Sequence, residues 1–317
     1  MNSYFIEHPF SIWGIFFILV FALLAFDLGI LNKKQDDIGI KKSLGLSVFY
    51  IIVGISFSFW IYSIKGWSSA SDYLTGYLIE KSLSLDNIFV ISLIFSAFQI
   101  PARYQHRVLF WGILGVLILR GIMIALGSWL IHQFEWITYI FALFLVITGI
   151  KMIFVQEVNK NIQETRFFRF LSSHLRVTPG LHQQKFIVWL KNDKGKTVIW
   201  VTPLFLVLIM IEAADLVFAV DSVPAIFSIT NDPYIVYTSN IFAILGLRSL
   251  YFALARMIER FVYLKYALAL ILVFIGGKVL AVWLFPIEKI PSLISLSVTI
   301  FLLSGGIAAS LLISKEE

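Results

Sequence analysis

Two aspartates lie deep inside long apolar stretches of the chain, where a charge is costly. Asp86 and Asp221 each precede a small polar residue, Asn87 and Ser222 respectively. One charge at the centre of a membrane helix costs about 2.5–3.5 kcal/mol, so such acids must be paired, hydrated, protonated or bound to a metal. Carboxylate, amide and hydroxyl oxygens suit hard cations such as Mg²⁺, Ca²⁺ and Mn²⁺. We therefore predict Asp86 and Asp221 as central ligands of such a cation, with Asn87 and Ser222 as auxiliary ligands.

Three further acids, Glu80, Glu212 and Asp215, are predicted to lie along the ion path or to carry coupling protons. Glu212 and Asp215 are three residues apart and so share one helix face. Glu80 and Asp86 are six apart and differ by about 120° around a straight helix. Either these acids mark two depths of one path or the helices unwind there, and Pro224 favours a break in the sixth span. The structural alternative for the acids is ion pairing within the bundle.

Basic residues also occur inside the apolar stretches, and for them we expect roles other than contact with a cation. Arg120, Arg248 and Lys81 are assigned to ion pairing or gating. Lys151 and Lys278 are near helix ends, and their long side chains are expected to reach the membrane surface.

The elements that must position these residues are membrane helices. Of the 317 residues, 59% are hydrophobic and 14% are charged, against roughly 45–50% and 25% in soluble domains. The fold class is therefore an all-α polytopic membrane protein, a single membrane domain over 1–317. Apolar stretches of about the length needed to cross a bilayer predict nine spans at 10–31, 42–64, 74–98, 108–131, 136–155, 198–230, 236–255, 262–285 and 292–313.

Composition and motifs exclude several function classes. Cysteine is absent, which removes thiolate metal sites and Cys nucleophiles. None of the five His residues falls at depth in a span, so we expect no zinc or copper site. The chain has no phosphate-binding glycine loop and no nucleophile elbow. We therefore expect no enzyme activity and no organic cofactor.

The Lys and Arg residues are strongly segregated between alternate connections. Eighteen fall on the odd connections and the C-terminus, whereas only Lys65 and Lys289 fall on the other side. Positive charge marks the cytoplasmic side, so the N-terminus is predicted outside and the C-terminus in the cytoplasm. The longest connection, 156–197, becomes a cytoplasmic basic loop. This distribution explains the net charge of +6, so we expect no nucleic-acid partner.

Two parts of the chain resemble each other at nearly constant spacing. EKSLSLDN at 80–87 matches DLVFAVDS at 215–222, LRG at 119–121 matches LRS at 247–249, and ALFLVITGIK at 142–151 matches ALILVFIGGK at 269–278. The copies, 74–155 and 198–285, each contain three spans, and 10–64 and 292–313 hold peripheral helices. Since three is odd, the second copy has the opposite orientation. Such a 3+3 inverted-topology repeat is typical of secondary transporters with a midplane site between the repeats.

These motifs resemble the TerC/Alx family of integral membrane proteins. The resemblance rests on GYLIEKSLSLDNIFV at 76–90, EAADLVFAVDSVPAIF at 212–227, TSNIFAILGLRSLYF at 238–252 and LKYALA at 264–269. The predicted ligand and path residues all match the family pattern. The resemblance implies a protein of the bacterial cytoplasmic (inner) membrane that exports Mn²⁺, with an alkaline-pH response in the Alx branch and a historical link to tellurite resistance. Composition and spacing alone reach only a hard divalent cation or a proton.

The resulting hypothesis is a secondary transporter that exports Mn²⁺ from the cytoplasm by rocking of the two repeats, with proton antiport as the expected coupling. The alternative is a membrane-protein assembly or stress-response factor that carries no ion and docks partner proteins on the 156–197 loop; no particular partner protein is indicated. Replacement of the deep acids abolishes function under the first hypothesis and is tolerated under the second. An intramembrane hydrolase is disfavoured because no Ser–His pair or metalloprotease motif occurs.

Overall fold

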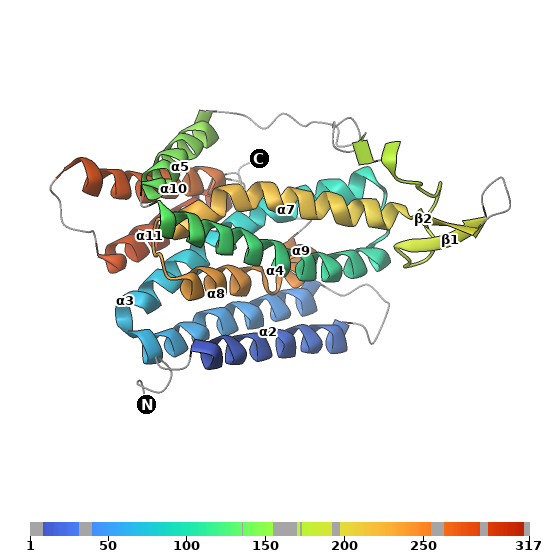
Figure 1. Cartoon of the computed structure of the whole chain (residues 1–317), viewed down its shortest axis with the longest axis horizontal. Helices are drawn as coiled ribbons and strands as arrows, with labels where there is room; N and C mark the ends of the chain where they lie inside the picture. Colours follow the sequence, from blue (N-terminus) through green and yellow to red (C-terminus); the bar gives the residue numbers. More distant parts are fainter. Residues whose placement is uncertain are drawn as a thin grey trace.

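The computed structural model is a bundle of helices that run along its long axis (Figure 1). It describes residues 9–31, 40–134, 136–154, 170–171, 173–191, 197–254, 263–285 and 291–313. The helices in these ranges are α2 (Pro9–Leu31), α3 (Ile40–Ala97), α4 (Ala102–Gln133), α5 (Ile137–Phe154), α7 (Pro203–Phe227), α8 (Pro233–Ile244), α9 (Leu247–Leu254), α10 (Leu264–Leu284) and α11 (Ser292–Ile313).

The helices follow the order of the expected spans. Seven segments of the described residues are long and apolar enough to cross a membrane, and one of them, Lys41–Ser84, runs from the first arm of α3 into the second. The described part of α2 adds a shorter apolar stretch, Ser11–Asp27. The prediction of an all-α, multi-pass membrane fold is confirmed.

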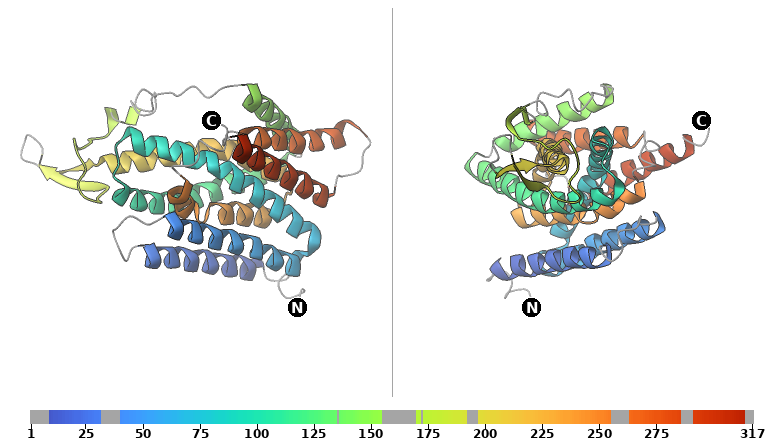
Figure 2. Two further views of the ribbon diagram at one scale, coloured as in Figure 1. Left: turned by 180° about the vertical axis from the view of Figure 1, so that it is seen from behind. Right: turned by 90° about the vertical axis from the view of Figure 1, so that its right-hand side faces the viewer.

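Helix α3 consists of two arms that meet at Gly66. The backbone there has φ 84° and ψ −179°, a conformation that a residue with a Cβ rarely adopts. The two arms contain the expected spans 42–64 and 74–98, and Figure 2 shows them meeting in a sharp bend at one end of the bundle. The second arm carries Glu80, Asp86 and Asn87 into the bundle.

The sixth span differs from its prediction at both ends. The segment Thr197–Val201 is not helical but forms strand β2, which pairs antiparallel with β1 (Ile187–Lys191). Its β-branched and aromatic residues favour a strand, and Pro203 then starts α7 at a position where proline is well tolerated. The expected break at Pro224 was wrong, since α7 continues through it to Phe227. The polar connection therefore ends in a hairpin at one end of the bundle (Figure 1).

The break in helical structure lies in the seventh span instead. Helix α8 ends at Ile244, Leu245 has ψ 132°, and Gly246 has φ 81° before α9 begins at Leu247. Helix α8 is the centre of the bundle, because every residue from Tyr234 to Ile244 is buried. Discontinuous helices of this kind often line the sites of membrane transporters.

Helices α5 and α10 meet through two glycines that allow close backbone approach. A Cβ on Gly149 would lie 2.6 Å from the Ala269 carbonyl oxygen, and a Cβ on Gly276 would collide with the Ala142 carbonyl oxygen. Gly149 therefore contacts the early part of α10, and Gly276 contacts the early part of α5. Contacts that run in opposite directions along the two sequences mean that α5 and α10 are antiparallel.

Helices α2 and α11 flank this bundle. Helix α2 packs through aromatic side chains: the Phe16 ring lies 6.3 Å from Phe57 and 5.8 Å from Phe242. Helix α11 packs against α10 and α3. Each flanking helix also supplies a partner to a buried basic residue, as described below.

Candidate functional site: a buried charge cluster around Arg120

Arg120 is the centre of a polar cluster inside the apolar bundle. Its side chain is fully buried on α4. The Nη1 atom donates to Glu80 Oε1 at 2.6 Å, and the Nη2 and Nε atoms donate to the two carboxylate oxygens of Asp215 at 3.0 and 3.1 Å. A guanidinium presents several donors in a fixed plane, which allows one arginine to hold two acids. Arg120 therefore links α3, α4 and α7.

Two neutral side chains complete the shell of Arg120. Its Nη1 atom also donates to Ser222 Oγ at 2.8 Å and to Asn240 Oδ1 at 3.1 Å. Asn240 lies on α8 and was missed by the sequence analysis, although an amide within an apolar run is itself a signal of a buried polar site. Its inclusion brings the central helix α8 into the cluster.

Seven-residue spacing places the polar residues of α3 and α7 toward Arg120. Glu80 and Asn87 are seven residues apart, as are Asp215 and Ser222, and residues at this spacing share a helix face. Asn87 Nδ2 donates to Asp215 Oδ1 at 3.4 Å, across the interface of the two helices. The structure thus brings together four of the predicted ligand and path residues around Arg120, which was itself predicted to form ion pairs.

Glu212 lies one turn before Asp215 but does not join the cluster. Both of its carboxyl oxygens are buried, and neither has a hydrogen-bond partner among the described residues. The carboxyl group packs against Gly115 of α4, where a Cβ would collide with it, and near Gly112. Burying a carboxyl group without a hydrogen-bond partner costs free energy. Packing alone therefore does not explain why a glutamate is present at position 212.

Two other bases inside the bundle have partners outside this cluster. Lys81 Nζ donates to the Ala243 carbonyl oxygen at the end of α8, at 2.9 Å. Arg248 on α9 forms an ion pair with Asp27 of α2, with Nη2 2.8 Å from Oδ2, and also donates to the Asp27 carbonyl oxygen. Both members of this pair are buried.

The two lysines expected to reach the surface behave differently. Lys151 is exposed. Lys278 is only 8% exposed and donates to Ser295 Oγ of α11 at 2.9 Å. The prediction was therefore wrong for Lys278, because α11 covers the face of α10 from which it projects.

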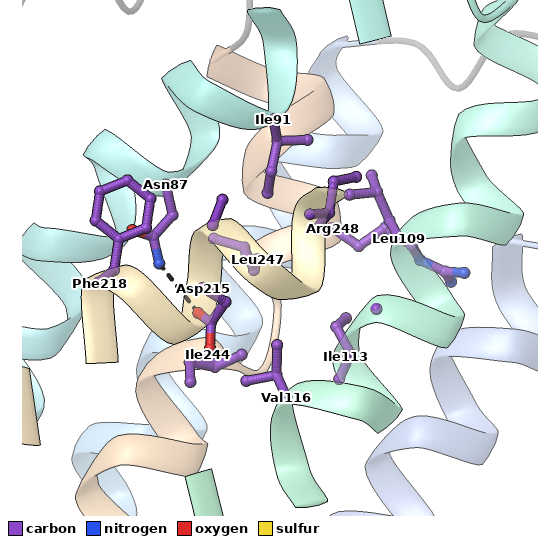
Figure 3. A pocket seen from close by; sticks show the side chains of 13 residues that line it. Asn87, Ile91, Leu109, Ile113, Val116, Asp215, Phe218, Ile244, Leu247 and Arg248 are labelled. Carbon is purple, nitrogen blue, oxygen red and sulfur yellow. Dashed lines mark hydrogen bonds between the residues drawn. The ribbon is translucent and has the colours of Figure 1, made fainter. Parts of the chain in front are cut away.

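A small cavity adjoins the cluster (Figure 3). Its volume of about 20 Å³ is enough for one water molecule. The polar residues on its wall are Asn87, Asp215 and Arg248, and the rest of the lining is apolar. Two larger cavities, of about 230 and 320 Å³, share Thr138, Tyr139 and Asn231 in their linings. They lie where α5 begins and α7 ends.

Comparison with known proteins places this architecture in a family. The model of the "Integral membrane protein TerC family" matches residues 65–317, which include every residue of the charge cluster. The chain belongs to the TerC family. An uncharacterized membrane protein of Rickettsia bellii is 52% identical to this TerC protein over 300 residues, covering 95% of this chain and 97% of the relative.

Other relatives of this TerC protein carry a more specific name. A protein of Photorhabdus laumondii named "Putative membrane-bound redox modulator Alx" is 45% identical over 280 residues, covering 86% of each chain. A protein of Shigella flexneri with the same name is 45% identical over 296 residues, covering 90% of each. No solved structure matches. The resemblance that the sequence motifs indicated is confirmed.

The two aspartates predicted as central ligands are placed only by their backbone. Asp86 lies on the second arm of α3 and Asp221 on α7, each directly before a residue of the cluster, and their side chains are outside the described part of the TerC protein. Both helices are continuous there, so the alternative that they unwind is wrong. Among the residues whose positions are described, no three His, Cys, Asp or Glu side chains form a group suited to a metal ion.

Proposed function

We propose that this TerC protein is a secondary transporter that exports Mn²⁺ from the cytoplasm across the bacterial inner membrane. The observation that carries the proposal is the concentration of carboxyl groups around Arg120. Arg120 pairs with Glu80 and Asp215, which leaves one negative charge, and Glu212 adds a third carboxyl group nearby. A cation at this point would compensate the negative charge that Arg120 leaves unpaired.

The chemistry of the candidate ligands favours a hard cation. Asp86 and Asp221 directly precede Asn87 and Ser222, two residues that the cluster holds in place. Oxygen ligands suit Mn²⁺, Mg²⁺ and Ca²⁺ better than soft metals, and the absence of Cys removes thiolate ligands. Among these hard cations, membership of the TerC family supports Mn²⁺ as the substrate.

The arrangement of the two copies supports alternating access. Gly149 and Gly276 occupy matching positions of the proposed repeats, and each contacts the other copy at matching residues, Ala269 and Ala142. Reciprocal contacts between matched positions are what a two-fold axis produces, and antiparallel α5 and α10 favour an axis in the membrane plane. We infer an inverted-topology repeat with the N-terminus outside, in which one repeat rocks against the other.

Export needs a driving force, and proton antiport fits best. A membrane potential of 100 mV, inside negative, opposes outward movement of a divalent cation by about 4.6 kcal/mol. Inward protons would offset this cost, and Glu80, Glu212 and Asp215 are the acids that would carry them. The name of the Alx relatives refers to redox modulation, but a chain without Cys has no thiol to exchange.

The alternative assembly function has one observation in its favour. The hairpin exposes Ile187, Trp189 and Ile199 on one face, which a partner protein could cover. Trp189→Ser and Ile199→Ser should leave metal flux unchanged under the transport proposal.

The test is Mn²⁺ flux into proteoliposomes containing purified, folded protein. We expect wild-type protein to carry Mn²⁺ and both Asp86→Asn and Asp221→Asn to lose nearly all flux, because each change removes a charge with little change in size. The double variant should be little worse than either single variant. Asp232→Asn is the matched control: this partly exposed acid caps α8 and pairs with Lys65 away from the cluster, and Asn caps helices equally well. Absence of flux from folded wild-type protein would contradict the proposal, and wild-type flux in one variant would exclude that aspartate as a ligand.

A further inference from the structure

The two buried arginines of the described residues occupy matched positions but have different partners. Arg120 and Arg248 are 128 residues apart, in the matching LRG and LRS sequences, and Glu80 and Asp215 are matched at an offset of 135. Arg120 holds both members of this acid pair. Arg248 is instead held by Asp27, which belongs to neither copy.

If the two copies exchange their conformations, Glu80 and Asp215 exchange places, so the acid pair stays the same. Arg120 and Arg248 also exchange places, so the arginine beside the acids changes. Arg120 already uses donors from all three of its nitrogens on the cluster, so a second guanidinium cannot occupy the same position. The observed arrangement therefore has a counterpart in which Arg248 holds the acids and Arg120 is withdrawn.

Arg248 shares a cavity wall with one of the acids, although its guanidinium is directed toward Asp27. It lines the same small cavity as Asp215 and Asn87 (Figure 3). Its Nε atom and the Oδ1 atom of Asp27 are buried without a hydrogen-bond partner among the described residues, so their pair is incompletely satisfied. Gly246, with φ 81°, lies two residues before Arg248 and gives α9 a hinge that the continuous helix α4 lacks.

We propose that Arg120 and Arg248 alternate as the counter-ion of the Glu80–Asp215 pair, and that Asp27 on α2 is a latch that holds Arg248 in the withdrawn position. The exchange rests on the inverted repeat inferred under the proposed function, and its coupling to cation export rests on the proposed transport. A helix outside the repeats thereby sets the balance between two arrangements that the repeats alone would leave nearly equal.

The absence of Cys allows a direct test by labelling a single introduced thiol. Asn231→Cys places the reporter on the wall of the two larger cavities, and Ser63→Cys, exposed on the first arm of α3, is the matched control reporter. Purified protein in nanodiscs is treated with a maleimide, without Mn²⁺. Asp27→Asn should release Arg248, favour the other arrangement and slow labelling at position 231 by about fivefold or more, with no change at position 63.

The effect of Asp27→Asn must depend on Arg248. Arg248→Gln alone should label at the wild-type rate, and Asp27→Asn combined with Arg248→Gln should return to that rate, because no guanidinium is left to move. An unchanged rate in Asp27→Asn, or an equal decrease with and without Arg248, would overturn the proposal.

A second pair of variants keeps the test decisive if Asp27→Asn does not fold. Arg120→Gln should fold when Arg248 is present, because Arg248 takes over the acids, and it should also label slowly at position 231. Arg120→Gln with Arg248→Gln leaves Glu80 and Asp215 without a guanidinium and should lose the folded state. Equal loss of folded protein in both variants would overturn the exchange. None of these measurements uses Mn²⁺ flux, so a failure of the transport proposal would be seen separately.

Discussion

At matched positions the two halves of the bundle, 74–154 and 203–284, carry the same basic residues in different surroundings. In the first half Arg120 holds the central acids and Lys151 is exposed. In the second half Arg248 pairs with Asp27 and Lys278 donates to Ser295. Both second-half partners come from the flanking helices α2 and α11. The difference teaches that the partners supplied by the peripheral helices make the surroundings of the matched residues unequal.

The two halves also differ in their backbone. Helix α4 is continuous over 32 residues, whereas its counterpart is divided into α8 and α9 at Gly246. The α5–α10 contact, in contrast, is the same from both sides. Symmetric and asymmetric features can therefore be tested separately by substitutions at matched positions.

The largest loss of stability is expected at the contact between α5 and α10. Gly149→Val and Gly276→Val should each cost about 3 kcal/mol or more, because the added side chain collides with a backbone carbonyl of the facing helix. Thermal unfolding in detergent and the yield of folded protein measure this cost. Gly277→Ala is the control, since a Cβ there meets nothing within 4 Å. A large loss for one glycine and none for its mate would contradict the reciprocal packing.

A smaller effect is expected at the helix break. Gly246→Ala should cost about 2–3 kcal/mol, because a Cβ is strained at positive φ and would lie 2.6 Å from Tyr50 Cβ. The matched residue in the first half is Ile118, which is 65% exposed on a continuous helix, and Ile118→Ala should change stability by less than about 1 kcal/mol. Denaturation of the two variants side by side measures the asymmetry. Equal losses would mean that the break is not specific to the second half.

The smallest effect is expected for the matched lysines. Lys278→Met removes the hydrogen bond to buried Ser295 and should cost about 1–2 kcal/mol. Lys151→Met should have an effect near zero, because the residue is exposed. Melting temperatures of the two variants compare them directly. A Lys151 variant that is as destabilised as the Lys278 variant would show that α11 does not account for the difference.

The positions of the helices and of the charged residues within them could be read from the chain. Hydrophobicity over about 20 residues is a local property, so the order of the spans was recoverable. The shared faces of Glu80 with Asn87 and of Asp215 with Ser222 were implicit in their seven-residue spacing. The start of the sixth span was not recoverable, because an apolar strand of five residues resembles the beginning of a membrane helix.

What the sequence by itself determined was a multi-pass helical membrane protein of the TerC family, with acids and bases at depth in matched positions. Only the tertiary structure decided which of these charges meet. Arg120 could have paired with several acids, and it holds Glu80 and Asp215 because α7 packs against both α3 and α4. Asn240 joins them because α8 passes through the centre. An ion pair between distant residues depends on which helices lie side by side, and hydropathy along the chain carries no information about that.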